Sequence, residues 1–163
     1  MSGVKAKAAG GAASGHIKVI AENRKARAAY TVDEKLEAGL QLTGSEVKSL
    51  RDGTANLSDA YALPKGAEMY LLNAHIGTYK PANLFTHEPT RGRKLLLHRA
   101  EIDRWAAKVR ERGYSIIPLV LYFKNGRAKV ELGLCRGKTH EDRRQDIKER
   151  ETKREIEREV RRR

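Results

Sequence analysis

The sequence has few residues that support disulfide, metal or membrane chemistry. Its single cysteine, Cys135, excludes an internal disulfide framework and zinc sites built on cysteine pairs, and it is typical of a reducing cytosol. No apolar run approaches the ~18 residues of a membrane-spanning helix, so we predict a cytoplasmic protein without a membrane partner. Residues 1–16 are rich in Ala, Gly and Ser and have no apolar core, which predicts a flexible N-terminal segment.

Catalytic motifs are lacking as well. The five histidines have no metal-ligand spacing, and no serine or cysteine has a plausible base partner. Residues 133–139 end in Gly-Lys-Thr like a phosphate-binding loop, but their two glycines are one residue too close together. We therefore expect no enzymatic activity, no cofactor and no metal site.

Positive charge is what the sequence has in excess. Lys and Arg number 34 against 21 Asp and Glu, which gives a net charge of +13 and a pI near 10.0. The excess is spread along the chain, with +5 in residues 1–29, +4 in residues 30–135 and +4 in residues 136–163. This balance makes nucleic acid the first partner to consider.

The clearest structural pattern is a β-hairpin near residue 125. An apolar, β-branched run at 116–123 and an alternating run at 128–134 flank Asn125-Gly126, which favours a two-residue turn. This turn predicts the facing pairs Phe123/Ala128, Leu121/Val130 and Leu119/Leu132. The other face of the hairpin would carry Val120, Tyr122, Lys129 and Glu131.

Two helices are predicted from caps and periodicity. Thr43 and Glu46 form a capping box that begins a short helix, which Gly53 ends. A longer helix has an apolar stripe at Ile102, Trp105, Ala106 and Val109 and ends at Gly113. Trp105 is expected in the core because it lies on this stripe.

The remaining segments predict short strands. Residues 30–42 alternate around a bulge or bend at Gly39, and residues 57–63 and 69–76 form a second hairpin, while 77–92 is a long loop. Many short strands with few long helices favour a closed sheet. We predict a mainly β fold with α-helices, an OB-like antiparallel barrel of about six strands over residues 17–135.

The C-terminal tail, residues 136–163, is highly charged and has little to bury. It holds twelve Lys or Arg, eight Asp or Glu and three aliphatic residues, of which Ile147 faces away from Ile156 and Val160 on a helix. Pairs such as Glu149–Lys153 favour a helix by only ~0.2–0.5 kcal/mol each. We expect a tail that is helical only when bound to a polyanion, the alternative being a solvated tail.

Several motifs, in order and with intact spacing, resemble the SsrA-binding protein (SmpB) family from residue 17 onwards. They are Asn-Arg-Lys-Ala-Arg at 23–27, Glu-Ala-Gly at 37–39, Thr-Gly-Ser-Glu-Val-Lys-Ser-Leu-Arg at 43–51, Arg-Gly-Arg-Lys-Leu-Leu-Leu at 91–97 and Arg-Gly-Lys at 136–138. The resemblance implies an OB-fold adaptor that binds the tRNA-like domain of transfer-messenger RNA (tmRNA). It further implies delivery of tmRNA to stalled ribosomes in trans-translation, as a non-catalytic protein bound to RNA as a monomer.

The resemblance also implies which residues contact tmRNA. Glu37 is ambiguous, because it could accept from a base, a ribose hydroxyl or a cation, or could form a structural ion pair. The cations at 24–27 could follow phosphates or form an ordinary solvated charge run. The expected tmRNA-binding set is Asn23, Arg24, Lys25, Arg27, Glu37, Lys48, Arg51, Arg91, Arg93, Lys94 and Leu96.

For the tail, the resemblance implies contacts with small-subunit RNA at the decoding centre and in the empty mRNA channel. This chain departs from the family pattern at Thr139 and Glu141, which stand where a Lys and an aromatic or His are usual, and His140 lies one place early. Arg143 replaces a usual Lys and keeps the charge. The expected tail set is Arg136, Gly137, Lys138, His140, Asp142, Arg143, Arg144 and Lys148.

A different class of function is the alternative. A structural ribosomal or ribosome-assembly protein with an OB barrel would show the same charge and strand pattern. Such a protein would stay with intact ribosomal subunits at high salt, whereas an adaptor would co-purify with one small stable RNA.

Overall fold

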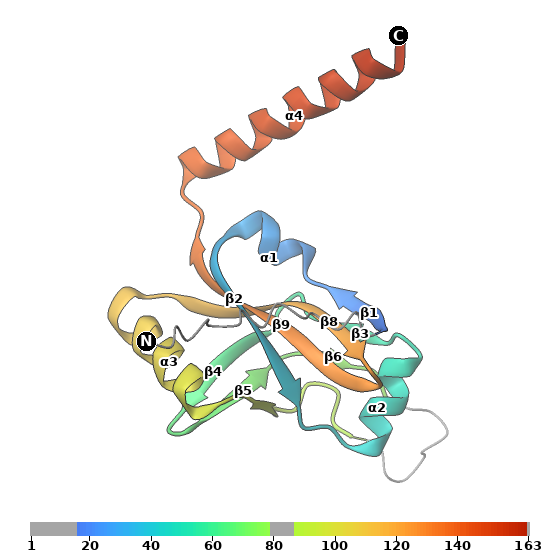
Figure 1. Ribbon diagram of the computed structural model, residues 1–163, viewed down its shortest axis with the longest axis vertical. Coiled ribbons are helices and arrows are strands. Elements are labelled where there is room, and N and C mark those ends of the chain that lie inside the picture. The colour runs from blue at the N-terminus through green and yellow to red at the C-terminus, as the bar shows by residue number, and fades with distance from the viewer. Residues whose placement is uncertain (1–15, 79–86, 163) are drawn as a thin grey trace, which may run out of the picture.

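The computed structural model describes residues 16–78 and 87–162, and its centre is a closed ring of six antiparallel strands. The ring runs β8-β4-β5-β7-β2-β9 and closes where β9 pairs with β8, so the predicted barrel of about six strands is confirmed. β1 adds to the ring by pairing with β8, and β3 pairs with β6 in a separate two-stranded sheet (Figure 1). The strands are β1 (Ile17–Glu22), β2 (Tyr30–Leu40), β3 (Ala55–Asn56), β4 (Tyr61–Lys65), β5 (Glu68–Leu72), β6 (His75–Ile76), β7 (Arg93–Leu96), β8 (Ser115–Lys124) and β9 (Arg127–Gly137).

In the described parts of the chain, three helices accompany the barrel and a fourth leaves it. They are α1 (Arg24–Ala29), α2 (Gly44–Arg51), α3 (Arg99–Arg112) and α4 (His140–Arg162). The two predicted helices are confirmed as α2 and α3: Trp105 is fully buried, and Gly113 ends α3 with a φ of 66°. The helix α1 was not predicted; it begins at Asn23, whose side chain accepts a hydrogen bond from the Ala26 amide at 3.0 Å.

The β8–β9 hairpin has the predicted turn but a different register at its far end. Asn125 and Gly126 both have positive φ, and the pairs Phe123/Ala128 and Leu121/Val130 are confirmed. The prediction that Leu119 faces Leu132 is wrong, because Pro118 takes that place and the register shifts between Pro118 and Val120. Proline has no amide hydrogen for the ladder, so a bulge forms beside it and turns Leu119 into a second cluster with Ala26 and Cys135.

In β2 the predicted irregularity also lies elsewhere. The register shift falls between Val32 and Glu34, not at Gly39. Gly39 is where β2 changes partner, since it pairs with Lys129 of β9 and with Leu96 of β7. A β-carbon at Gly39 would lie 3.2 Å from the Leu96 β-carbon, so this close approach of two strands favours a glycine.

The second predicted hairpin is present as β4–β5, with its turn at Gly66 and with Pro64 inside β4, but its strands are shorter than the predicted 57–63 and 69–76. His75 and Ile76 belong instead to β6, which pairs with β3. Half of the predicted loop 77–92 (residues 79–86) and nearly all of the predicted flexible segment 1–16 (residues 1–15) lie outside the described residues. Within the described ranges, no helix is both long and apolar enough to cross a membrane.

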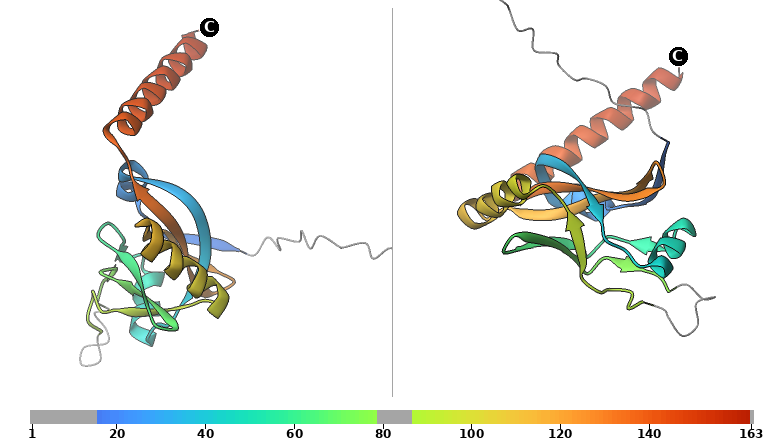
Figure 2. Two further views of the ribbon diagram at one scale, coloured as in Figure 1. Left: turned by 90° about the vertical axis from the view of Figure 1, so that its left-hand side faces the viewer. Right: turned by 60° about the horizontal axis from the view of Figure 1, so that its bottom comes forward.

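The C-terminal tail projects away from the barrel as α4, and the views agree that its far end lies apart from the other elements of the described residues (Figures 1 and 2). None of its residues is buried. The expected helix of the tail is confirmed as His140–Arg162, and its dependence on a bound polyanion stays a prediction. A capped first turn and strong helix formers such as Glu, Lys and Arg favour this helix even without a buried face.

Candidate nucleic-acid interface

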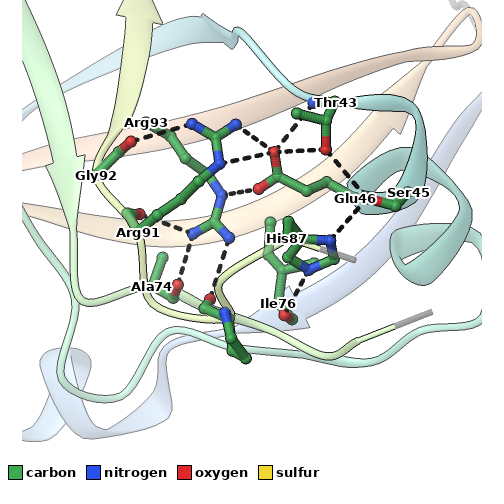
Figure 3. A network of polar contacts seen from close by, with 10 residues as sticks. Thr43, Ser45, Glu46, Ala74, Ile76, His87, Arg91, Gly92 and Arg93 are labelled. Carbon is green, nitrogen blue, oxygen red and sulfur yellow. Dashed lines mark hydrogen bonds and ion pairs between the residues drawn. The ribbon is translucent and has the colours of Figure 1, made fainter. Parts of the chain in front are cut away.

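Arg93, expected on the RNA-binding surface, lies in the protein interior instead (Figure 3). Its guanidinium donates to the Glu46 carboxylate and to the carbonyl oxygens of Ala74 (2.7 Å), Pro89 (3.1 Å) and Arg91 (3.1 Å). The Arg93 and Glu46 side chains are both 0% exposed. The prediction that Arg93 contacts phosphate is therefore wrong, because every face of its guanidinium is turned towards protein acceptors.

Glu46 is the centre of this network. It accepts from the Thr43 amide at 3.0 Å, as the capping box predicted, and also from Arg91, whose side chain is 31% exposed. Burial would raise the pKa of the Glu46 carboxyl, but hydrogen bonds from Arg91, the Thr43 amide and Arg93 outweigh it and hold the pKa at about 2, below the ordinary 4.5. Arg91 therefore also has a structural role, as a hydrogen-bond donor to Glu46.

The depressed pKa of Glu46 predicts a stability that depends on pH. Because the pKa is lower in the folded chain, the Glu46 carboxylate stabilises the fold above about pH 4.5, and this contribution is lost as the pH falls towards 2. We expect the urea-unfolding free energy to fall more steeply between pH 6 and pH 3 in the parent than in Glu46→Gln. Equal slopes in the two proteins would contradict this role of Glu46.

Asn23 is also a structural residue. Its side chain is buried and donates to the carbonyl oxygens of Leu57 and Pro118, both at 3.0 Å, while its own oxygen caps α1. The prediction that Asn23 lies on the RNA-binding surface is corrected accordingly. It supports such a surface only by fixing α1 to β8.

The remaining candidates on β2 and β7 gather on one face of the barrel, together with three residues of the β8–β9 hairpin. This Glu37 surface consists of Glu37, Lys94, Leu96, Tyr122, Lys124 and Lys129. One shallow hollow is lined by Glu37, Lys94, Leu96 and Lys129, and a second by Glu37, Lys124 and Lys129. In the β2–β9 pairing, Gly39 faces Lys129. Glu37 lies two residues before Gly39 on β2, so its side chain is on the same face of the sheet as that position.

Glu37 has structural partners within this surface. Its carboxylate accepts from the Tyr122 hydroxyl and lies 3.5 Å from the Lys124 ammonium. The hydrogen bond from Tyr122, with lesser contributions from Lys124 and Lys129, lowers the pKa of Glu37. Burial and the neighbouring Glu37 raise the pKa of Tyr122. Glu37 is 39% exposed, so it can still accept from a ribose hydroxyl while it orients Lys124.

Leu96 and Lys94 point outward from β7. Leu96 is 53% exposed, which is unusual for a leucine within a sheet and makes it an apolar contact point among the lysines. Lys94 pairs with Glu68 at 2.9 Å, and this hydrogen bond raises the pKa of Lys94. Both side chains of the pair are accessible to solvent, so the pair contributes little to stability. Lys94 can therefore leave Glu68 and bind a phosphate instead.

The other predicted cations of the barrel lie elsewhere. Arg24, Lys25 and Arg27 are exposed on α1, where Lys25 pairs with Asp59 at 3.2 Å. Lys48 and Arg51 are exposed in the last turn of α2. None of the five lines either hollow of the Glu37 surface within the described parts of the chain.

At the base of the tail, Thr139 and Asp142 begin α4. The Asp142 amide donates to the Thr139 hydroxyl at 3.2 Å, and the Thr139 amide donates to the Asp142 carboxylate at 3.1 Å. Hydrogen bonds from Thr139 lower the pKa of Asp142. Thr139, which stands where the family usually has a lysine, therefore caps the helix of this chain.

The remaining tail candidates divide between a joint and an exposed helix. Arg136 pairs with Asp33 of β2 at 3.2 Å, and Gly137 pairs with Tyr30 at the end of β9. Lys138 is largely covered. The exposed candidates on α4 are His140, Arg143, Arg144 and Lys148.

Sequence reasoning did not select three members of the Glu37 surface: Tyr122, Lys124 and Lys129. The hairpin register already placed Tyr122 and Lys129 on one face, but only the pairing of β2 with β9 brings that face to Glu37. In the described ranges, no cluster of three or more His, Cys, Asp or Glu side chains could hold a metal. The arrangement is suited to binding a polyanion through lysines around an apolar side chain.

Comparisons with known proteins identify the relatives of this chain. The sequence model of a family described as "SmpB protein" matches residues 20–162. The "SsrA-binding protein" of Myxococcus xanthus (strain DK1622) is 82% identical over 147 residues, 90% of this chain and 91% of that protein. The "SsrA-binding protein" of Anaeromyxobacter sp. (strain Fw109-5) is 59% identical over 98% of this chain and 99% of its own length. A solved structure described as "tmRNA-SmpB: a journey to the center of the bacterial ribosome" has a TM-score of 0.63 and 41% identity, covering 78% of this chain and 93% of the solved one.

Proposed function

This chain belongs to the SmpB family, and we propose on that premise that it is an RNA-binding adaptor in trans-translation. It binds the tRNA-like domain of tmRNA and delivers that RNA to stalled ribosomes. The observation that carries the proposal is the 82% identity to an SsrA-binding protein over 90% of the chain. The function has no chemical step, and its place of action is the cytoplasm, where ribosomes translate.

Within this function, the barrel (residues 17–135) is the part that grips tmRNA, through the Glu37 surface. Lys94, Lys124 and Lys129 supply positive charge for phosphates. The exposed Leu96 supplies an apolar contact for a ribose or base, and Glu37 an acceptor for a 2′-hydroxyl. The buried Arg93 lies in β7, the strand that carries Lys94 and Leu96, and holds that strand from inside the barrel.

The C-terminal tail is the part that engages the ribosome. Its helix presents charged side chains on all sides and buries none of them on the barrel, so all of its cations are available to RNA. Arg143, Arg144 and Lys148 follow the capped first turn and would contact small-subunit RNA at the decoding centre. The rest of α4 would lie along the empty mRNA channel.

Lys129→Ala tests the assignment of the Glu37 surface. Removing one phosphate contact should weaken binding to the tRNA-like domain of tmRNA and reduce the slope of log affinity against log salt by about 0.9. The measurement is a mobility-shift titration at several salt concentrations. Unfolding midpoints should not change, because the lysine is at the surface.

The matched control is Arg112→Ala in the last turn of α3, which removes the same charge from an exposed position. The Glu37 surface touches α3 only near Arg99 to Ile102, and Arg112 lies at the opposite end of that helix. We expect its affinity and salt slope to match the parent. Equal losses in both variants would mean that the barrel binds RNA through overall charge and not through this surface.

A further inference from the structure

Lys138 occupies the joint between the barrel and the tail, and it is unusually well covered for a lysine. Its side chain is 11% exposed, and its ammonium donates to the Arg27 carbonyl at 3.1 Å and to the Asp146 carboxylate. Its amide donates to the Ala29 carbonyl at 3.0 Å. One residue therefore contacts both the barrel side of the joint and the helix that leaves it.

On the barrel side, Lys138 is held by the C-terminal end of α1. The last carbonyl groups of a helix have no partner within the helix, and here Lys138 satisfies two of them, at Arg27 and Ala29. α1 is itself fixed to the barrel by Asn23, which bonds the carbonyls of Leu57 and Pro118. Lys138 is thus a fixed point on the barrel even though it follows the last strand.

On the tail side, two side-chain contacts in the described part of the chain tie α4 to the residues before it. The Thr139–Asp142 cap is local to the first turn and stabilises the helix in any orientation. The Lys138–Asp146 pair instead joins the second turn of α4 to the fixed point. Because no residue of α4 is buried, packing does not set its direction.

We infer that Asp146 is a positioning residue: through Lys138 it sets the direction in which α4 leaves the barrel. A pair with a covered ammonium and a carboxylate that is 34% exposed is screened less by salt than an exposed pair. A helix held in one direction also loses less orientational freedom when it enters a channel. The effect on entry into the ribosome depends on the proposed function. The direction of α4 in the free protein does not depend on it.

The test is a distance distribution between spin labels on the barrel and on α4 of the free full-length chain. Labels at Lys65→Cys on β4 and Arg158→Cys on α4 occupy exposed positions. The native Cys135 is buried, and burial raises its pKa to about 11, so it stays protonated and unlabelled. We expect a single narrow distribution in the labelled parent and a width at least about two-fold larger in Asp146→Asn.

Two further variants distinguish a change in the direction of α4 from a general effect of removing a carboxylate. Asp146→Glu keeps a carboxylate and should restore most of the narrow distribution, while Glu151→Gln removes an exposed α4 carboxylate away from the joint and should leave it unchanged. Helix content from circular dichroism should be equal in all variants. A parent-like width in Asp146→Asn, or broadening accompanied by loss of helix, would overturn the inference. Because no RNA or ribosome is present, this failure is distinguishable from failure of the proposed function.

Discussion

A chain that ends at Thr139 is expected to lose peptide tagging on stalled ribosomes but to keep a folded barrel. The truncation removes α4 whole, and with it every tail cation beyond Lys138. Without these contacts, tmRNA bound to the barrel would lack the group that detects a vacant mRNA channel. The measurement is tagging of a nascent peptide in a reconstituted reaction with a truncated message, where the product should fall to background.

The same truncated chain should unfold in urea at the parent midpoint, because α4 has no buried residue. This separates a loss of function at the ribosome from a loss of fold. Lys138 is retained, so α1 keeps the two hydrogen bonds at its C-terminal end. Tagging at the parental level would refute the proposed role of the tail.

Arg93→Ala is expected to destabilise the barrel by about 3–5 kcal/mol, because it leaves the buried Glu46 carboxylate short of a cation. Three carbonyl oxygens, those of Ala74, Pro89 and Arg91, lose a donor at the same time. The measurement is the unfolding free energy in urea at neutral pH. Weakened RNA binding by this variant would follow from the loss of fold and would not report a phosphate contact.

The adjacent Lys94→Ala is the matched control. Lys94 points outward and makes a solvent-screened pair with Glu68, so its removal should leave the unfolding free energy nearly unchanged. Its effect should be on RNA affinity instead. Comparable destabilisation by the two substitutions would contradict the inward placement of Arg93.

The elements set by local sequence were predictable. Asn125-Gly126 fixes the turn of the β8–β9 hairpin, and the stripe that includes Trp105 together with Gly113 fixes α3. The predicted partner of Leu119 was wrong because Pro118 shifts the register of the β8–β9 pairing, and where that shift falls depends on the partner strand. The helix α1 was missed because it spans six residues and depends on the cap at Asn23.

The candidate site was less predictable because long-range pairing assembles it. Glu37 and Lys129 are far apart in sequence, and only the β2–β9 register brings them to one face. The run Arg91-Gly92-Arg93-Lys94 reads as a uniform basic cluster, yet strand alternation turns Arg93 inward and Lys94 outward. Nothing local to Arg93 indicates that Glu46, the capping residue of α2, will be its partner.

The central claim is that the barrel binds tmRNA and that the tail separately contacts the ribosome. Its most direct test is the dissociation constant for the tRNA-like domain of tmRNA, measured at one salt concentration for the full chain and for the chain that ends at Thr139. The account predicts values that agree within about three-fold, since the Glu37 surface is complete in both proteins. A loss of affinity of about a hundred-fold on removing α4 would contradict it, because the tail would then be the principal tmRNA contact.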